Sequence, residues 1–553
     1  MGVAIPVLYG KLTGLKGSQI NALERIYRRR LHSELVTVEL GKYLAAVSYE
    51  LNRQIGVIAT RKGTVTHVVI GDAKGIFLPP LNDYPLGRRA LRGLRFIHTH
   101  LHNEPLDKDD LTDLSLLRFD VIAAIGLKED EPWKLHIAHL SSSTQKEPCT
   151  VLPPEDFYDS DFDFKSFIEG LEEQLERERG FDISAQGGAK GAARERAILV
   201  SVSTKARFEQ EDSVEELQEL ALSSDVEVLD KVIQRPKEIN PRYLMGEGKV
   251  RELVINAMNR GATLLIFDQD LNPSQIKAIN ELTELKVIDR SQLILDIFAG
   301  RAHSRDGKVQ VELAQLKYRL PRLSGKGTAM SKLMGGIGGR GPGEMKLEID
   351  RRRVRDRIAL LEKELKVLSE ARKQRKARRI ERRIPIVSIV GYTNAGKSTL
   401  LNALTNSAVF VEDKLFATLD TASRRLRFPR EREVVITDTV GFIRDLPRDL
   451  LAAFKATLEE LEDADLLLHV VDVSNHRFEQ QIESVERIMF DLNLADKRKL
   501  LVFNKIDRMD REEAANAAAR FNAIPVSALD RTTFQPLLSA VERNIFDLTD
   551  QAI

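Results

Sequence analysis

The segment GYTNAGKST has the residue types and spacing that hold phosphate groups. It fits the pattern G-x-x-x-x-G-K-S from Gly391 to Ser398, after a buried β-type run and before a helical run. In such a loop, backbone N–H groups and the helix N-terminus hold phosphates, the lysine reaches the β and γ oxygens, and the serine ligates Mg²⁺. A chance glycine-rich turn is the alternative, and the flanking strand and helix argue against it. The predicted phosphate-binding residues are Gly391, Tyr392, Thr393, Asn394, Ala395, Gly396, Lys397, Ser398 and Thr399.

Two further segments provide candidates for the magnesium side of such a site. The sequence DTVG ends a β-type run about forty residues after the phosphate loop, where Asp438 would hold the Mg²⁺ shell and the Gly441 N–H would sense the γ-phosphate. Between the two motifs, LFATLDTAS offers Thr418 and Thr421, and we expect Thr418 to ligate Mg²⁺ together with Ser398. The predicted residues of these segments are Asp438, Thr439, Val440 and Gly441, and Phe416, Ala417, Thr418, Leu419 and Asp420.

The motif NKID ends another β-type run and has the residues that select guanine. Asp507 can accept hydrogen bonds from guanine N1–H and from the exocyclic amine, a donor pattern that adenine does not offer. Asn504 and Lys505 would brace the base and the phosphate loop, and a later loop, SAL, would face guanine O6. The predicted residues are Asn504, Lys505, Ile506, Asp507, Ser527, Ala528 and Leu529. The ordered motifs therefore predict GTP and GDP, rather than ATP, as ligands.

The residue after the DTVG glycine is Phe442, where Ras-like enzymes carry the glutamine that positions the attacking water. An apolar ring cannot orient water, so we expect slow intrinsic hydrolysis in which another residue or a partner positions the water. The alternative is that Phe442 is a packing residue and a nearby group takes over. The residues that we expect to act in catalysis are Lys397, Thr418 and Gly441.

A second candidate site lies far upstream, in RFIHTHLHNEPLDKDD. His98 and His100 leave a β-type run at positions i and i+2, so both side chains point to one side and can ligate zinc together with Asp110. The stretch resembles the JAB/MPN metalloprotease pattern, with Glu50 in the place of the upstream glutamate. Because Asp107 replaces the serine of that pattern and the spacing is one residue short, we do not expect an active peptidase. A satisfied polar loop without metal is the alternative.

These motifs need several folded domains to position them. A chain of 553 residues is too long for one hydrophobic core, and its strands and helices alternate. The fold class is α/β and multidomain. We predict an additional N-terminal α/β domain, JAB/MPN-like or unrelated, over residues 1–160, a second α/β domain over 196–320, and a Ras-like P-loop G domain over 384–553. A linker over 161–195 and a glycine-rich loop with a basic helical linker over 321–383 connect them. The last G-domain helix, FQPLLSAVERNIFDL, leaves little chain for a separate C-terminal domain.

The segment before the G domain is strongly basic. Residues 346–383 contain sixteen Lys or Arg and seven acidic residues, with apolar residues mostly three or four positions apart. This pattern predicts an amphipathic helix or helical hairpin, and its charge is typical of a patch that binds ribosomal RNA. A solvated coiled-coil face is the alternative. The preceding MGGIGGRGPGE, residues 334–344, has too much glycine for the interior of a helix or strand.

Taken together, these motifs resemble the HflX family of ribosome-associated, Obg/HflX-type GTPases. MGGIGGRGPGE, the basic linker, GYTNAGKST, LFATLD, DTVGF and NKID occur in the family's order, and RYLMGEGKVREL, LLIFDQDLNPSQ and KVIDRSQLILDIFAGRA are similar to its N-terminal domain. The resemblance spans Arg196 to Asp547, and Phe442 is the family's residue at that position.

The resemblance implies a GTPase that binds the large (50S) ribosomal subunit and its 23S rRNA and splits stalled or idle ribosomes, with hydrolysis stimulated by the ribosome. It also implies ATP binding at the middle domain, although no P-loop occurs there. The alternative function is a GTP-dependent assembly or RNA-remodelling factor that acts on free large subunits. A third class, a metallohydrolase with an appended G domain, requires zinc at the upstream histidines.

Composition limits the remaining choices. The 84 basic and 83 acidic residues give a net charge of +1, so no global charge attracts nucleic acid or membrane. A single cysteine, Cys149, cannot form an internal disulfide, and we find no leader or membrane-spanning run. We therefore expect a cytoplasmic monomer without a transmembrane segment, and peripheral contact with a membrane stays open.

Overall fold

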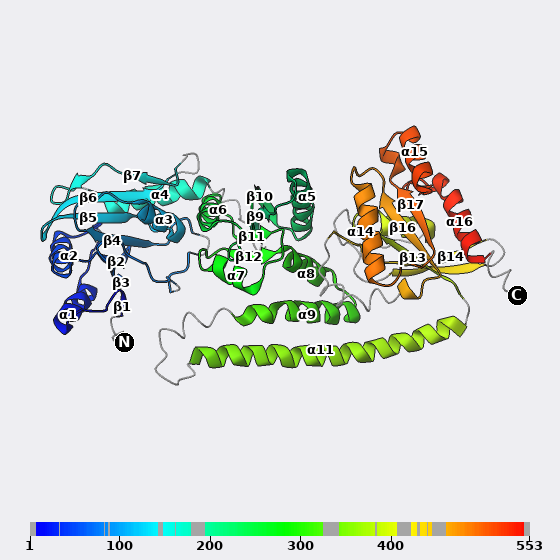
Figure 1. Cartoon of the computed structure of the whole chain (residues 1–553), viewed down its shortest axis with the longest axis horizontal. Coiled ribbons are helices and arrows are strands. Elements are labelled where there is room, and N and C mark those ends of the chain that lie inside the picture. The colour runs from blue at the N-terminus through cyan, green and yellow to red at the C-terminus, as the bar shows by residue number, and fades with distance from the viewer. Residues whose placement is uncertain are drawn as a thin grey trace. The chain divides into compact units, whose positions relative to one another are not determined.

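Figure 1 shows the computed structural model of the chain. The chain has two compact units. Residues 1–198, 236–265 and 278–287 form the first, and residues 199–235, 266–277 and 288–553 form the second. The structure describes residues 7–32, 34–81, 83–86, 89–141, 147–160, 162–178, 194–324, 342–381, 384–405, 422–428, 432–439, 441–444 and 461–546. Among the helices in these ranges, none is long and apolar enough to cross a membrane.

The N-terminal domain, in the first unit, is built on an eight-stranded sheet. Its strand order is β1-β3-β2-β4-β5-β6-β7, and β8 pairs with β6. The strands are β1 (Leu8–Gly10), β2 (Ile55–Thr60), β3 (Val65–Ile70), β4 (Leu94–His100), β5 (Ile122–Lys128), β6 (Glu131–Leu140), β7 (Cys149–Val151) and β8 (Glu155–Asp156). The helices are α1 (Gly17–Arg25), η1 (Ile26–Arg28), α2 (Val38–Leu51), α3 (Lys108–Leu117) and α4 (Phe164–Glu178). Strand β4 is buried at every position because it lies in the middle of the sheet, although it carries an arginine and two histidines.

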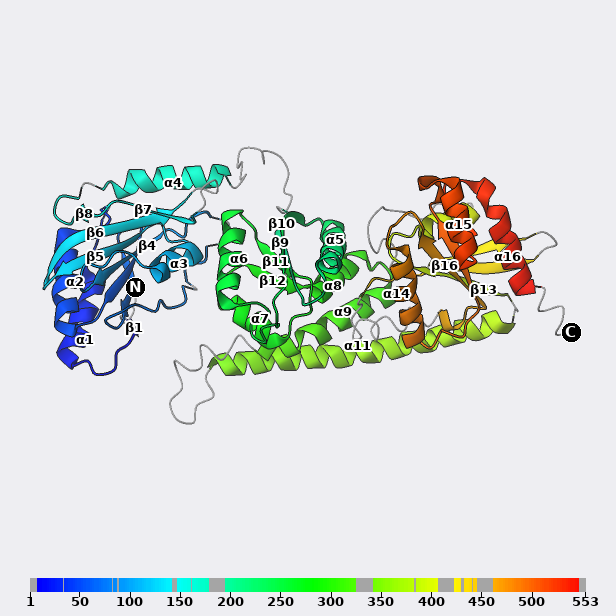
Figure 2. The same ribbon diagram turned by 45° about the horizontal axis from the view of Figure 1, so that its top comes forward.

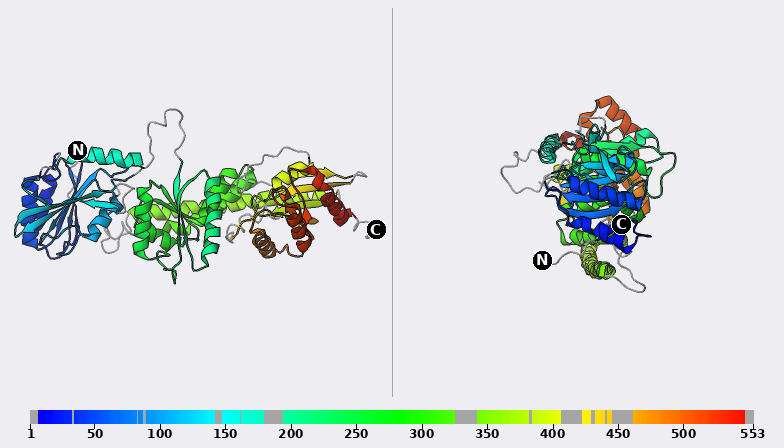
Figure 3. Two further views of the ribbon diagram at one scale, coloured as in Figure 1. Left: turned by 90° about the horizontal axis from the view of Figure 1, so that it is seen from above. Right: turned by 90° about the vertical axis from the view of Figure 1, so that its left-hand side faces the viewer.

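Helix α4 corrects the predicted boundary of this domain. The sequence suggested a linker over 161–195, but Phe164, Ile168, Leu171 and Leu175 lie in the hydrophobic core of the N-terminal domain. These apolar residues recur every three or four positions, which places them on one face of the helix. Figures 2 and 3 show α4, coloured cyan, along this domain. The domain therefore continues to the end of α4 at residue 178.

The next part of the chain forms a four-stranded sheet in the order β10-β9-β11-β12. The strands are β9 (Arg196–Val202), β10 (Glu227–Gln234), β11 (Leu264–Phe267) and β12 (Lys286–Asp289). The helices that alternate with them or follow them are α5 (Arg207–Ser223), α6 (Glu247–Asn259), α7 (Pro273–Asn280), α8 (Arg290–Arg301) and α9 (Arg305–Arg319), and the turn η3 (Pro321–Ser324) follows. Strands and helices alternate along the chain as the sequence predicts.

Helix α11 (Pro342–Glu381) is a single long helix that packs against α9 (Figures 1 and 2). Leu361 is 1% exposed and contacts Val309 and Leu313 of α9. Ion pairs join Arg357 to Glu312 at 2.7 Å and Arg305 to Glu364 at 2.8 Å, a pairing that makes the two helices antiparallel. Leu361, Ile358 and Leu365 of the basic segment thus pack on α9, whereas Ile349 is 47% exposed. Most of the predicted glycine-rich segment, up to residue 341, lies outside the described residues.

Truncation of Leu361 tests this helix pair. We expect Leu361→Ala to cost roughly 2–4 kcal/mol locally, because it removes a buried side chain and leaves a cavity. Amide hydrogen exchange in α9 and α11 should then become at least tenfold faster. Leu360→Ala is the matched control, since Leu360 is 55% exposed on the same helix. Equal protection in the two variants would contradict the packing.

The C-terminal domain is a six-stranded sheet in the order β14-β15-β13-β16-β17-β18. Its strands are β13 (Ile386–Gly391), β14 (Ala422–Arg427), β15 (Glu433–Asp438), β16 (Leu466–Asp472), β17 (Lys499–Asn504) and β18 (Ile524–Pro525). Its helices are α12 (Lys397–Thr405), α14 (Phe478–Asp491), η4 (Ile506–Arg508), α15 (Arg511–Phe521), η5 (Arg531–Phe534) and α16 (Gln535–Phe546). All pairs are parallel except β14 with β15. The ends of β13, β15 and β17 therefore meet at one edge, which is where ligands bind to open α/β sheets.

Candidate nucleotide site and histidine cluster

The phosphate loop lies between the end of β13 and the start of α12. Lys397 is buried, and its Nζ donates to the backbone carbonyl of Tyr392 at 2.7 Å. Gly396 has a φ of +85°, and a Cβ there would lie 2.3 Å from Asn504 Nδ2, so the position requires glycine. The loop is thus closed around its lysine, and phosphate oxygens would compete with the Tyr392 carbonyl for the ammonium group.

Electrostatics make this lysine sensitive to an anion. Burial lowers the pKa of Lys397 to about 8, and the Asp438 carboxylate opposes that shift. A buried ammonium group is poorly solvated, so added negative charge favours its protonated form. Triphosphate oxygens would therefore raise the pKa of Lys397 again and bind its charged form.

Ser398 and Asp438 lie together where α12 begins and β15 ends. Ser398 Oγ donates to Asp438 Oδ2 at 2.5 Å, and Asp438 is fully buried. A hydroxyl and a carboxylate form the all-oxygen donor set that Mg²⁺ prefers. These two side chains fit the metal that the sequence predicts.

The DTVG segment packs directly on the phosphate loop. Thr439 Oγ1 donates to the carbonyl of Ile389 at 2.7 Å. A Cβ on Gly441 would lie 2.8 Å from Thr393 Cγ2 and 2.9 Å from Lys397 Nζ. A side chain here would push into the loop, so glycine is required for the close approach of the two backbones. The arrangement brings the Gly441 backbone close to the lysine, and its contact with the γ-phosphate stays a prediction.

Several predicted residues cannot be placed. Those that lie outside the described residues are Phe416, Ala417, Thr418, Leu419, Asp420, Thr421 and Val440. The threonine expected to ligate Mg²⁺ therefore stays a prediction.

Phe442 is a packing residue. Its ring is 2% exposed, its N–H donates to the Gly391 carbonyl at 3.1 Å, and its own carbonyl accepts from Thr393 N–H at 2.7 Å. Both backbone groups are therefore held by the phosphate loop. The ring is turned into the protein interior, so it neither orients water nor leaves room for a polar side chain that could.

Substituting Phe442 tests that role. We expect Phe442→Gln to lower the melting temperature, because it buries an amide without partners at a cost of roughly 2–4 kcal/mol. The glutamine should not act as a catalytic residue, so single-turnover GTP hydrolysis without ribosomes should rise by less than about threefold. Leu401→Gln, another buried apolar position of the same domain, controls for general destabilisation. A rise of about tenfold or more would show that the position faces the attacking water.

The guanine-selecting residues are joined to the phosphate loop by Asn504. Its Nδ2 donates to the Ala395 carbonyl at 2.9 Å, and its Oδ1 accepts from Ala528 N–H at 2.9 Å. Ser527 Oγ donates to Asp507 Oδ1 at 2.5 Å. The structure thus brings three predicted segments together through one buried amide. Of the other predicted guanine-site residues, Ile506 is the first residue of η4 and Leu529 is 78% exposed.

Asp472 is a residue that sequence reasoning missed. It ends β16, pairs in register with Asn504 of β17, and its Oδ2 lies 2.7 Å from Lys505 Nζ. Lys505 has a left-handed φ of +65°, which turns the chain toward the site. The signal in the sequence is an acidic residue at the end of a β-type run, VVD, in the strand before NKID. Asp472 holds the lysine that would lie along the base.

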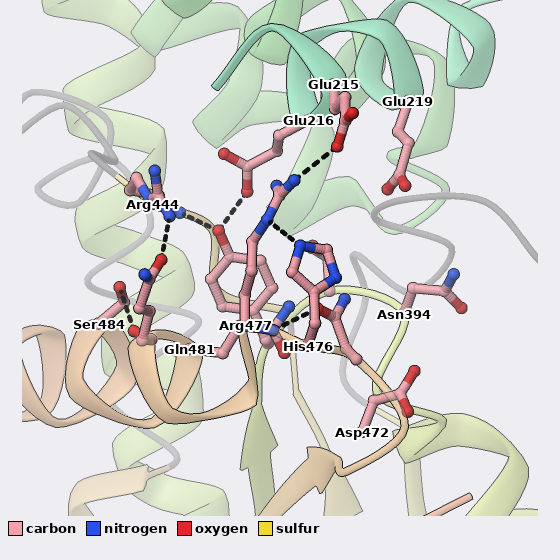
Figure 4. A pocket seen from close by; sticks show the side chains of 14 residues that line it. Glu215, Glu216, Glu219, Asn394, Arg444, Asp472, His476, Arg477, Gln481 and Ser484 are labelled. Carbon is pink, nitrogen blue, oxygen red and sulfur yellow. Dashed lines mark hydrogen bonds and ion pairs between the residues drawn. The ribbon is translucent and has the colours of Figure 1, made fainter. Parts of the chain in front are cut away.

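Tyr392 makes contacts that the sequence could not indicate. Its hydroxyl donates to Glu216 of α5 and accepts from Arg444 N–H at 2.7 Å. Arg477 lies next to it and contacts Glu215 at 2.5 Å. Figure 4 shows the polar pocket between these residues, with the glutamates of α5 on one side and the phosphate-loop residue Asn394 on the other. Burial, and then the Glu216 carboxylate, raise the pKa of Tyr392, so its hydroxyl stays protonated.

The histidines of the N-terminal domain also come together as predicted. The Nε2 atoms of His98 and His100 are 2.9 Å apart, and Asp110 lies 3.2 Å from the first and 3.6 Å from the second. Burial, and then His98, lower the pKa of His100, which keeps its ring neutral. Glu50 was predicted to join this group, but its carboxylate accepts from Gln19 Nε2 at 3.3 Å on the surface instead. Glu50 lies on the exposed side of α2, near the C-terminal end of this helix, which explains the difference.

Family models match three consecutive parts of the chain. Residues 211–299 match "GTP-binding GTPase N-terminal", residues 301–379 match "GTP-binding GTPase Middle Region", and residues 386–505 match "50S ribosome-binding GTPase". The match over residues 301–379 includes both α9 and most of α11, which also pack on each other. From the sequence we predicted instead that α9 belongs to the domain that ends at residue 320.

Similar proteins cover most of the same region. A GTPase HflX from Caldanaerobacter subterraneus subsp. tengcongensis is 48% identical over 65% of this chain and 82% of its own length. The GTPase HflX of Escherichia coli K12 is 45% identical over 58% of this chain and 77% of its own length. A solved structure of a GTP-binding protein from Sulfolobus solfataricus with GDP is 25% identical over 64% of this chain and 99% of its own, with a TM-score of 0.36. Because 82% of the first relative is matched at 48% identity, this chain belongs to the HflX family of GTPases and hydrolyses GTP.

Proposed function

We propose that this GTPase binds the large (50S) ribosomal subunit and its 23S rRNA and splits or recycles stalled or idle ribosomes. The match of residues 386–505 to a model described as a 50S ribosome-binding GTPase supports the partner. The observation that carries the proposal is the burial of Phe442 at 2% exposure. Its position lacks a side chain that orients water, so another residue or a partner has to supply that group, and our proposal assigns it to the ribosome.

In this proposal each motif has one task. Lys397 and the loop N–H groups hold the β- and γ-phosphates, and Gly441 senses the γ-phosphate through its backbone. Ser398 and Asp438, with Thr418, hold the Mg²⁺ that neutralises charge on the β and γ oxygens. The base is held by Asn504, Lys505 and Asp507, with the backbone of Ser527, Ala528 and Leu529. The contacts between Ser398 and Asp438, and between Asn504 and the phosphate loop, support these assignments.

Contact with rRNA is supported by charge on α11. Arg352, Arg355, Lys363 and Lys366 are exposed, while the apolar face of the helix packs on α9. Exposed cations on a rigid helix can neutralise backbone phosphates whatever the base sequence. We therefore propose that this exposed face of α11 contacts rRNA and that its contribution falls as salt concentration rises.

The test is GTP turnover with and without 50S subunits, together with sedimentation of 70S ribosomes after addition of the protein and a non-hydrolysable GTP analogue. We expect 50S subunits to stimulate turnover and the 70S peak to shift into subunits. Lys397→Ala is the control that lacks phosphate binding. If turnover is unchanged by 50S subunits, the ribosome is not the activator. Binding to free 50S subunits with intact 70S ribosomes would support an assembly or RNA-remodelling role instead.

A further inference from the structure

The histidine cluster of the N-terminal domain, His98, His100 and Asp110, brings three possible metal ligands close together. His98 and His100 are two positions apart on β4, so their side chains point to the same side of the sheet. Asp110 faces them from the first turn of α3. Both histidines are at most 4% exposed, and ligand atoms from all three residues lie within 4.8 Å of one another. Two nitrogen atoms and a carboxylate that converge in this way can hold one cation.

The proton on His100 can be assigned from its neighbour. His100 Nδ1 lies 2.7 Å from the backbone carbonyl of Glu104. A carbonyl oxygen only accepts, so in the neutral ring Nδ1 carries the proton and Nε2 presents a lone pair to the cluster. Histidines that bind a metal through one ring nitrogen usually donate the N–H of the other ring nitrogen to a carbonyl or a carboxylate, which fixes the orientation of the ring.

The carboxylate is held as firmly as the histidines. Asp110 Oδ2 accepts from the backbone N–H of Asp107 at 2.9 Å, and Asp107 in turn caps the N-terminus of α3. Asp110 is therefore fixed with its oxygens toward His98 and His100. At 3.6 Å, its Oδ2 faces the lone pair of His100 Nε2, so two acceptors oppose each other.

A proton on His98 Nε2 can be donated to His100 Nε2 at 2.9 Å or to Asp110 Oδ1 at 3.2 Å, but it bonds well to only one of them at a time. A cation at the centre would pair with all three groups at once. The separations of 2.9, 3.2 and 3.6 Å between ligand atoms scatter around the edge of about 3.4 Å of a tetrahedron with 2.0–2.1 Å metal bonds. The spacing thus fits a small divalent ion without a change in the backbone.

We propose that His98 Nε2, His100 Nε2 and an Asp110 carboxylate oxygen bind one divalent transition-metal ion of the zinc class. Two imidazoles and one carboxylate suit Zn²⁺, whereas Mg²⁺ and Ca²⁺ prefer oxygen ligands alone. The side chain of Asp110 is 15% exposed, so the ion can reach the site from solvent. A water molecule would occupy the fourth coordination position. This site is separate from the nucleotide site and does not depend on the proposed action on ribosomes.

The experiment measures metal in the purified full chain after dialysis against zinc and removal of free ion. We expect about one equivalent per chain in the wild type and its loss in His98→Ala and in Asp110→Asn. His139→Gln is the matched control, because His139 lies in the same domain with its Nδ1 against the Leu140 carbonyl and should leave the zinc content unchanged. The melting transition of the N-terminal domain, recorded without zinc, establishes that this domain is folded in each variant.

A second readout does not depend on stoichiometry. Zinc should raise the melting temperature of the N-terminal transition in the wild type but not in Asp110→Asn, because the ion stabilises only the folded site. Bound Co²⁺ should also give the visible absorption of a four- or five-coordinate nitrogen and oxygen site. Metal-free wild type after zinc dialysis would overturn the proposal. Equal zinc content in the wild type and both cluster variants would overturn it as well, since the ion would then be bound elsewhere.

Discussion

Asp507→Asn is expected to change the nucleotide preference from GTP to XTP, with GTP affinity reduced on the order of a thousandfold or more. The asparagine amide would point a donor at guanine N1–H and the exocyclic amine, which are also donors, and buried unpaired donors are costly. Xanthine carries a carbonyl in place of the amine, so it accepts from the new amide. Ser527 Oγ donates to Asp507 Oδ1, and it can donate in the same way to the asparagine oxygen, which directs the NH₂ group to the base.

Competition of unlabelled GTP or XTP against fluorescent GDP in the wild type, and against fluorescent XDP in Asp507→Asn, measures this change. Ser527→Ala is the control, because it removes the orienting hydroxyl but leaves the carboxylate, and it should weaken binding without reversing the preference. Continued preference of Asp507→Asn for GTP would mean that the residue does not contact the base.

Lys397→Ala should have the second large effect. We expect GTP turnover to fall by at least about a hundredfold, because the buried ammonium is the only side-chain cation placed inside the described part of the phosphate loop. Folding should be retained, since Lys397 Nζ bonds only to the Tyr392 carbonyl at 2.7 Å and alanine favours the first turn of α12. Turnover close to wild type would contradict the assignment of this loop.

The same lysine predicts a pH dependence of nucleotide binding. In the free protein the pKa of Lys397 is about 8, so above pH 8 the ammonium loses its proton and nucleotide binding must restore it. Affinity for GDP should therefore be constant at pH 6.5–7.5 and fall toward tenfold per pH unit between pH 8 and 9. Lys397→Arg keeps its charge throughout this range, so its affinity should change little. A flat profile in the wild type would show that the lysine stays charged without nucleotide.

Local sequence was sufficient for most of the nucleotide site. The phosphate loop follows a strand and precedes a helix within one short segment, so its geometry depends on neighbours in the sequence. DTVG and NKID each follow a β-type run, and the ends of parallel strands meet at one edge of a sheet. Asp438 and Asn504 consequently lie against the phosphate loop, as predicted from motifs alone.

Other features depended on contacts between residues that are distant in the sequence. The linker expected over 161–195 contains a helix with an apolar face, and only the core that receives this face shows that α4 belongs to the N-terminal domain. Glu50 was chosen for its residue type, yet its position on α2 turns it to the surface. Asp472 and the contact of Tyr392 with Glu216 join strands and helices that no local pattern pairs.

The sequence alone determined the fold class, the order of the nucleotide motifs and the preference for guanine, because each follows from residue type and local spacing. The tertiary structure alone decided that the ring of Phe442 is buried rather than turned toward the attacking water. The sequence predicted the group of His98, His100 and Asp110, and the tertiary structure set its spacing, with ligand atoms within 4.8 Å of one another. The physical reason is that burial and spacing depend on how whole helices and strands pack together. A periodic pattern shows which face of an element is apolar, but it does not show which other element packs on that face.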